Sequence, residues 1–205
     1  MKRKSINVLL ATTLALLIPS PGRFVYGFVL VLEMNLLLLT GTLVVSFVKK
    51  IKMEELMSVI VIFMMLAVTI LFRQIFVIIQ PEIILTLGYI IYLVPLSLFM
   101  FGYIFESEQN KLLDNLKNNM IHLSSYSVFS LVFFLLRDLA GYGTFTFFGK
   151  NHQIYEKVII TSERIGVFSF IASIPGALIL SAIILYVYVY TRNKIDVYKK
   201  AEECK

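Results

Sequence analysis

Glu33 stands inside a long apolar run, with Asn35 two residues further along the chain. An ionisable side chain at that depth in an apolar helix is costly to desolvate, so it needs a partner, water or a bound proton. These residue types therefore indicate a site that could bind or transfer an ion or a proton. The alternative is structural: Glu33 is protonated, or pairs with a neighbouring helix, and only holds the helices together.

A second group of polar residues and glycines follows an apolar run in the other half of the chain, as Arg137-Asp138-x-x-Gly141-x-Gly143-Thr144. Closely spaced glycines allow tight packing or positive φ, and non-helical backbone at membrane depth is tolerated only inside protein or beside a cavity. The segment is therefore expected to be a structured re-entry after a helix. Arg137 is placed to extend to the lipid headgroups, with Asp138 beside it to neutralise its charge.

Motifs of soluble enzymes are missing from the sequence. It contains no P-loop, no H-E-x-x-H, no nucleophile elbow and no dinucleotide-binding glycine pattern. His122 and His152 have no partner residues at ligand spacing, and the single cysteine, Cys204, lies in a charged tail. We therefore expect no catalytic residue, no metal ligand and no disulfide.

The composition indicates a membrane protein. Hydrophobic residues make up 59% of the chain and charged residues only 16%, against about 25% charged in an ordinary soluble domain. In such a protein the net charge of +6 records lysines and arginines in loops on one side of the bilayer. The expected partner is the lipid bilayer, and nucleic acid is not expected.

Six apolar segments are expected to cross the bilayer, since a helix needs about 20 apolar residues to do so. A polar stretch, Glu106–Met120, separates the fourth from the fifth and is expected to be an amphipathic connector at the surface. The fold class is therefore all-α, a single six-helix membrane domain. The six expected spans are Ile6–Ile18, Phe24–Val48, Leu56–Ile79, Ile83–Phe105, Leu123–Leu139 and Ile165–Tyr190.

Proline interrupts two of these spans at corresponding places. Pro19 and Pro21 end the first, and Pro95 lies in the middle of the fourth, which is therefore expected to be kinked or broken there. Broken helices at matching positions of two halves are typical of inverted repeats with a site at the midplane. The expected organisation is a first repeat, residues 1–82, a second repeat, residues 83–191, and a charged cytoplasmic tail, residues 192–205.

The distribution of basic residues predicts the orientation. With the N-terminus inside, thirteen of the nineteen lysines and arginines fall on the inner side. Because inner loops carry the excess of such residues, both termini are expected in the cytoplasm.

The layout and its motifs resemble one family of membrane proteins. The motifs are the proline-broken first and fourth spans, the segment that begins at Arg137, and Ile174-Pro175-Gly176-Ala177 in the sixth span. Together they are similar to the integral membrane subunits of Rnf-type electron transport complexes, which are related to the sodium-translocating NADH:quinone reductase. Of the two paired subunits, the chain is more similar to the one with a cytoplasmic N-terminus, where the segment reads Arg-Glu-x-x-Gly-x-Gly-Thr. Asp138 replaces that glutamate.

The chain departs from this family at the metal site. The resemblance implies a cysteine just before the first-helix proline and another shortly after the fourth-helix proline, which together with a second subunit hold an iron–sulfur centre. Here Ile18 precedes Pro19 and Phe101 follows Pro95, and neither residue can ligate iron. No cofactor is therefore expected. An inverted repeat would bring Ile18 and Phe101 together near the middle of the bilayer.

The resemblance implies a divergent subunit of a redox-linked ion-translocating complex in the bacterial cytoplasmic membrane. The chain would be at most a non-catalytic subunit of a membrane oxidoreductase, with other membrane subunits as partners. Its role would be scaffolding or part of an ion pathway. Two other functions stay open: a six-helix subunit for uptake of a small, vitamin-type molecule, with residues 141–149 as binding loop, and a membrane assembly factor. The candidate ion-pathway or structural residues are Glu33, Asn35, Arg137, Asp138, Gly141, Gly143 and Thr144.

Overall fold

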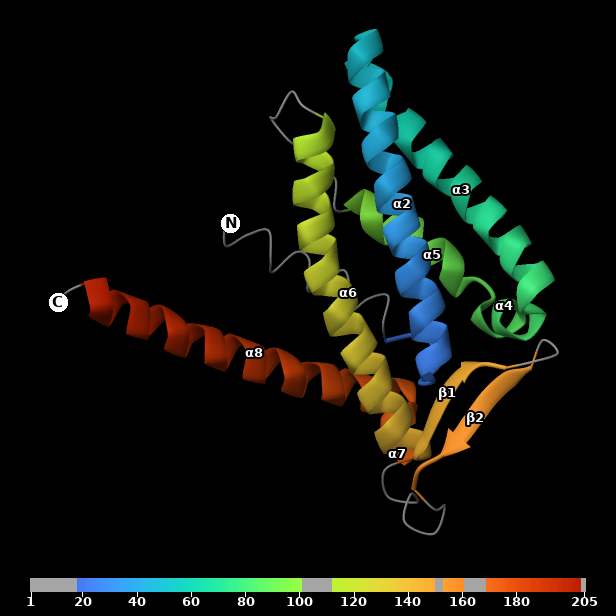
Figure 1. Ribbon diagram of the computed structural model, residues 1–205, viewed down its shortest axis with the longest axis vertical. Helices are drawn as coiled ribbons and strands as arrows, with labels where there is room; N and C mark the ends of the chain where they lie inside the picture. The colour runs from blue at the N-terminus through green and yellow to red at the C-terminus, as the bar shows by residue number, and fades with distance from the viewer. Residues whose placement is uncertain (1–17, 101–111, 150–152, 161–168, 204–205) are drawn as a thin grey trace.

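The computed structural model describes residues 18–100, 112–149, 153–160 and 169–203, and these are mostly helical (Figure 1). The expected first span, Ile6–Ile18, lies outside them except for Ile18. The long helices α2, α3 and α6 pack side by side with α2 between the other two, and the shorter α5 also packs on α2. The apolar core lies where these helices meet.

The central helix, α2, covers Phe24–Ile51, and α3 covers Met57–Ile79 after a single 3-10 turn, η1, at Glu54–Leu56. The sequence places both correctly, because long apolar runs are bounded by lysines at one end and by Pro81 at the other. Lys52 ends α2 in the left-handed conformation, with φ 62°. Helices cover α2 on several sides and bury many of its side chains, whereas a stripe along one face stays exposed, formed by Leu32, Leu36, Leu39, Leu43 and Phe47.

The close approach of α2 to α6 depends on Gly27. A Cβ on Gly27 would lie 2.0 Å from the ring of Phe134 in α6. Near this contact, buried residues of α2 include Val25, Val29 and Leu30. Only glycine lets the Phe134 ring lie against the α2 backbone.

The next segment is bent, but not at its proline. Helix α4, Pro81–Leu87, and helix α5, Ile90–Met100, meet at 69°. The bend lies at Gly88, where φ is +51°, a conformation that residues with a Cβ rarely adopt. Pro95 lies inside α5, and the helix continues through it. The expected break at Pro95 is therefore wrong, and a glycine seven residues earlier makes the bend.

Helix α6, Leu112–Tyr142, is longer than expected. It joins the predicted fifth span, Leu123–Leu139, to the second part of the polar stretch that we expected to form a separate connector. The chain therefore has no helix boundary near residue 120. The polar residues at the start of α6 extend the same helix beyond its apolar part.

A two-stranded antiparallel sheet follows α6 and departs from the all-α expectation. Strand β1, Thr144–Phe148, pairs with β2, Ile154–Val158, in register from Thr144 opposite Val158 to Phe148 opposite Ile154. We call this unit the hairpin. Threonine and phenylalanine alternate over residues 144–147 of β1, so Thr144 and Thr146 face one side together with Phe148, and Phe145 and Phe147 face the other. The described residues are thus mostly helical, as expected, but the all-α class is wrong in this segment, which forms two strands.

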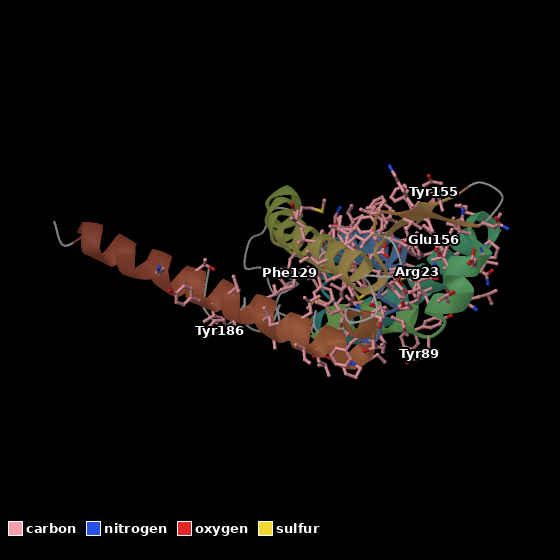
Figure 2. The ribbon with its side chains drawn as sticks, turned by 90° about the horizontal axis from the view of Figure 1, so that it is seen from below. Arg23, Tyr89, Phe129, Tyr155, Glu156 and Tyr186 are labelled. Carbon is pink, nitrogen blue, oxygen red and sulfur yellow. The ribbon has the colours of Figure 1, made fainter. Side chains whose placement is uncertain are left out.

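Of the last two helices, α7 packs against α6 and α8 forms an arm that leaves the bundle. The short α7, Ser169–Ala172, is followed after Ser173 by α8, Ile174–Glu203, which extends away from the other helices (Figure 1). The exposed Tyr186 lies on the part of α8 far from the bundle (Figure 2). Because α8 is continuous to Glu203, the boundary expected at residue 191 is not an element boundary.

Among the described residues, three helices are long and apolar enough to cross a membrane: α2, α3 and residues Ile174–Thr191 of α8. The bent pair α4 and α5 would make a fourth span if it counts as one. The length and apolar character of these helices support the assignment of the chain as a membrane protein. They do not confirm all six expected spans or the inverted repeat.

Candidate functional site

The Asp138 carboxylate at the end of α6 joins the start of α2 to strand β1. Its Oδ2 accepts hydrogen bonds from the backbone N–H of Phe24 at 3.1 Å and from the N–H and hydroxyl of Thr146 at 2.9 and 2.7 Å. Its Oδ1 accepts one from the Thr144 hydroxyl at 3.0 Å. Since α2 has no capping side chain of its own, Asp138 supplies the negative charge that a helix N-terminus favours.

The neighbouring Arg137 joins two further segments. Its Nη1 donates to the carbonyl of Ser20 at 2.7 Å, and its Nη2 donates to the carbonyl of Ala172 at 2.9 Å, where α7 ends. The side chain is 1% exposed. The expectation that Arg137 extends to the lipid headgroups is therefore wrong, because backbone carbonyls inside the protein take its hydrogen bonds.

The two glycines of the motif have separate roles. A Cβ on Gly141 would lie 2.7 Å from Cβ of Ala172, so this glycine lets α6 touch α7. Gly143 has φ +64°, and its carbonyl accepts hydrogen bonds from Ile159 and Ile160 beyond β2. Arg137, Asp138, Gly141, Gly143 and Thr144 thus belong to one junction of α6 with α2, α7 and the hairpin.

The hairpin is tied to the start of α2 on its other side as well. Phe24 lies 5.2 Å from Phe145, centroid to centroid. Arg23 forms an ion pair with Glu156 of β2, and these two side chains lie on the same side of the molecule in Figure 2. The sequence analysis missed this pair because its partners are 133 positions apart.

Glu33 lies apart from this junction, in the part of α2 that faces α3. Its side chain is 0% exposed. Thr69 of α3, also 0% exposed, is the polar side chain next to it. Among the described residues, neither carboxyl oxygen of Glu33 nor the Thr69 hydroxyl has a hydrogen-bond partner of normal geometry. The site is thus a buried carboxyl beside a hydroxyl. Thr69 could not be identified from the sequence, because it lies on a different helix from Glu33.

Asn35 points to a different helix. Its Nδ2 donates to the hydroxyl of Ser127 in α6 at 3.0 Å and to the carbonyl of Val31 at 2.7 Å. Asn35 therefore links α2 to α6, while Glu33 faces α3. The two residues that the sequence grouped together are not brought into one site.

The described residues contain no group of three or more His, Cys, Asp or Glu side chains that could hold a metal ion. Ile18 lies in the turn before α2 and is partly buried. Phe101 lies outside the described residues, so the predicted meeting of Ile18 and Phe101 stays a prediction.

The motif residues assemble a junction, and Glu33 and Thr69 form a separate buried polar site within the helices. Comparison of the chain with protein-family models, with characterised proteins and with solved structures gives no match.

Proposed function

We propose that this chain is a multi-pass membrane subunit of a redox-linked ion-translocating complex of the Rnf/Nqr type, and that it carries an ion or a proton at Glu33 without an iron–sulfur centre of its own. The observation that carries this proposal is the complete burial of Glu33 in α2, a helix that is long and apolar enough to span a membrane. A carboxyl at such a place is costly, and transport is the main use that membrane proteins make of one.

The junction at Arg137 and Asp138 supports the scaffolding part of the proposal. It fixes the start of α2 against α6, and therefore the register of Glu33 relative to the neighbouring helices. A proton-carrying or ion-carrying side chain needs such support, because small displacements change which groups it can reach. The motif residues are thus proposed to position the pathway and not to line it.

Isolation of the chain with its natural partners tests membership of a redox complex. Purified in mild detergent from native membranes, it should bring along flavin-bearing and cysteine-bearing membrane subunits. Iron analysis of the separated chain should be blank, since Ile18 and Phe101 cannot act as ligands.

The other two functions make different predictions in the same experiment. An ATPase module among the partners would indicate an uptake transporter. Transient association with many unrelated membrane proteins would indicate an assembly factor. Either result, or stoichiometric iron that survives Cys204→Ser, would contradict the proposal.

A further inference from the structure

Helix α3 carries polar groups that lead away from Glu33. Most residues of this helix are apolar, and its polar side chains include Thr69 and Arg73. These two are four positions apart and therefore neighbours on one face of the helix. Gln80, which ends α3, lies eleven positions from Thr69 and falls on the same face. One side of α3 thus carries polar groups from the level of Glu33 to the end of the helix.

Each of these groups has a buried atom that lacks a hydrogen-bond partner among the described residues: Thr69 Oγ1, Arg73 Nε and Gln80 Oε1. Together with both oxygens of Glu33, they make up five of the seven buried side-chain atoms of this kind in the part of the chain that the structure describes. Buried polar groups are nearly always satisfied by protein or by water. The row on one helix face is therefore a place where water between the helices would complete the missing hydrogen bonds.

The row of polar groups on α3 runs from Glu33 toward the hairpin. Gln80 donates from Nε2 to the Gly149 carbonyl of the hairpin at 3.3 Å, so the end of α3 lies beside the hairpin. The start of α2 and the end of α6 lie there too (Figure 1). We call this end of the molecule the hairpin face. From Glu33 the polar row leads to this face and away from Lys49 and Lys50 at the other end of α2.

Resting on the role proposed above for Glu33, we propose that Glu33 carries a proton and exchanges it with solvent at the hairpin face, through the Thr69 hydroxyl and water held by Arg73. In the release step the carboxyl O–H bond breaks, Thr69 accepts that proton and donates its own to water. The carboxylate is left with the electron pair, and the reverse steps load it again. Arg73 acts as a positioning residue through its Nε–H donor.

A proton fits this site better than a divalent metal cation. Calcium takes six to eight oxygen ligands and magnesium six, whereas in the described part of the chain Glu33 belongs to no group of three or more His, Cys, Asp or Glu side chains, and Thr69 is the neighbour that interacts with it. A carboxylic acid beside a hydroxyl is sufficient to hold and relay a proton.

Hydrogen–deuterium exchange of the Glu33 carboxyl tests the route. The full chain in lipid vesicles should show the infrared carbonyl band of a protonated carboxylic acid, which Glu33→Gln removes. On transfer to D₂O the band should shift, and Thr69→Val should slow that shift at least about tenfold. Thr69→Ser, which keeps the hydroxyl, should exchange like the unchanged protein. Thr42→Val is the matched control, because this buried hydroxyl of α2 donates to the Leu38 carbonyl of its own helix.

A second variant, Arg73→Met, should also slow the exchange. It allows the route to be tested even if Thr69→Val does not fold. Three results would overturn the route: no protonated-acid band that depends on Glu33, equal rates in the Thr69→Val and Thr42→Val proteins, or an Arg73→Met protein that exchanges as fast as the unchanged one. Failure here is distinct from failure of the proposed function. If Thr69→Val and Arg73→Met exchange at the normal rate while Glu33→Gln loses redox-driven translocation, the proposed route is wrong and the proposed function still holds. If exchange is slowed in Thr69→Val and Arg73→Met but Glu33→Gln still translocates normally, the proposed function is wrong and the route still holds.

Discussion

At the scale of single residues, Asp138 shows how one charged group can organise several segments. Its two oxygens accept hydrogen bonds from the first N–H of α2 and from two threonines of β1. The donors lie 114 positions before it and 6 and 8 positions after it. The sequence placed Asp138 in a motif, but the long-range partner could not be predicted, because nothing near Phe24 in the chain shows where the capping carboxylate comes from.

Asp138→Asn should therefore destabilise the protein strongly. The amide loses the negative charge at the start of α2, and its N–H₂ faces donors instead of accepting from them, so we expect a loss of about 2 to 3 kcal/mol in the free energy of unfolding. Chemical unfolding in mixed detergent micelles, followed by circular dichroism, measures it. Glu156→Gln, which removes a half-exposed ion pair with Arg23, should cost less than about 1 kcal/mol. Equal losses in the two variants would contradict this account of the junction.

At the scale of elements, the helices α2 and α3 were predictable and the bend between α4 and α5 was not. The bounds of α2 and α3 follow from apolar runs that end at charged residues or at a proline. The fourth segment contains both Pro95 and Gly88, and either can interrupt a helix, so the sequence alone does not show that the helix continues through Pro95 and that Gly88 takes a positive φ. The hairpin had a sequence signal, the alternation of threonine and phenylalanine over residues 144–147, which the expectation of helices throughout obscured.

Substitutions at these two positions separate the roles of glycine and proline. Gly88→Ala should strain the bend, cost about 1 to 3 kcal/mol and change the angle between α4 and α5. Pro95→Ala should leave the angle as it is. In a Cys204→Ser background, spin labels at Leu85→Cys and Leu96→Cys, two exposed positions, report the distance across the bend by pulsed electron paramagnetic resonance. A distance that changes with Pro95→Ala and not with Gly88→Ala would contradict our placement of the bend.

At the scale of the whole molecule, one end gathers the junction, the hairpin and the exit of the proposed proton route. Glu82 accepts a hydrogen bond from the N–H of Ile154, Gln80 donates to Gly149, and Arg23 pairs with Glu156. Lys49, Lys50 and Lys52 lie at the other end of α2. The expectation from the basic residues that these two ends lie on opposite sides of the bilayer stays a prediction. The contacts that join the loops at one end could not be predicted, because their partners lie far apart in the chain.

Labelling from one side of the membrane tests this arrangement. In vesicles of known orientation and a Cys204→Ser background, Glu82→Cys and Lys157→Cys should react with an impermeant thiol reagent from the same side. Lys50→Cys should react only from the opposite side, which the excess of basic residues predicts to be the cytoplasm. The arrangement fails if the cysteines at 82 and 157 react from opposite sides.

The central claim is that Glu33 carries the ion or proton that the complex translocates. Its most direct test is redox-driven translocation by the purified complex in lipid vesicles, comparing Glu33→Gln with Glu55→Gln, which changes an exposed carboxylate outside the long helices. The account predicts that Glu33→Gln assembles with its partners and transfers electrons but loses translocation, while Glu55→Gln behaves like the unchanged protein. Full translocation by an assembled Glu33→Gln complex would contradict it.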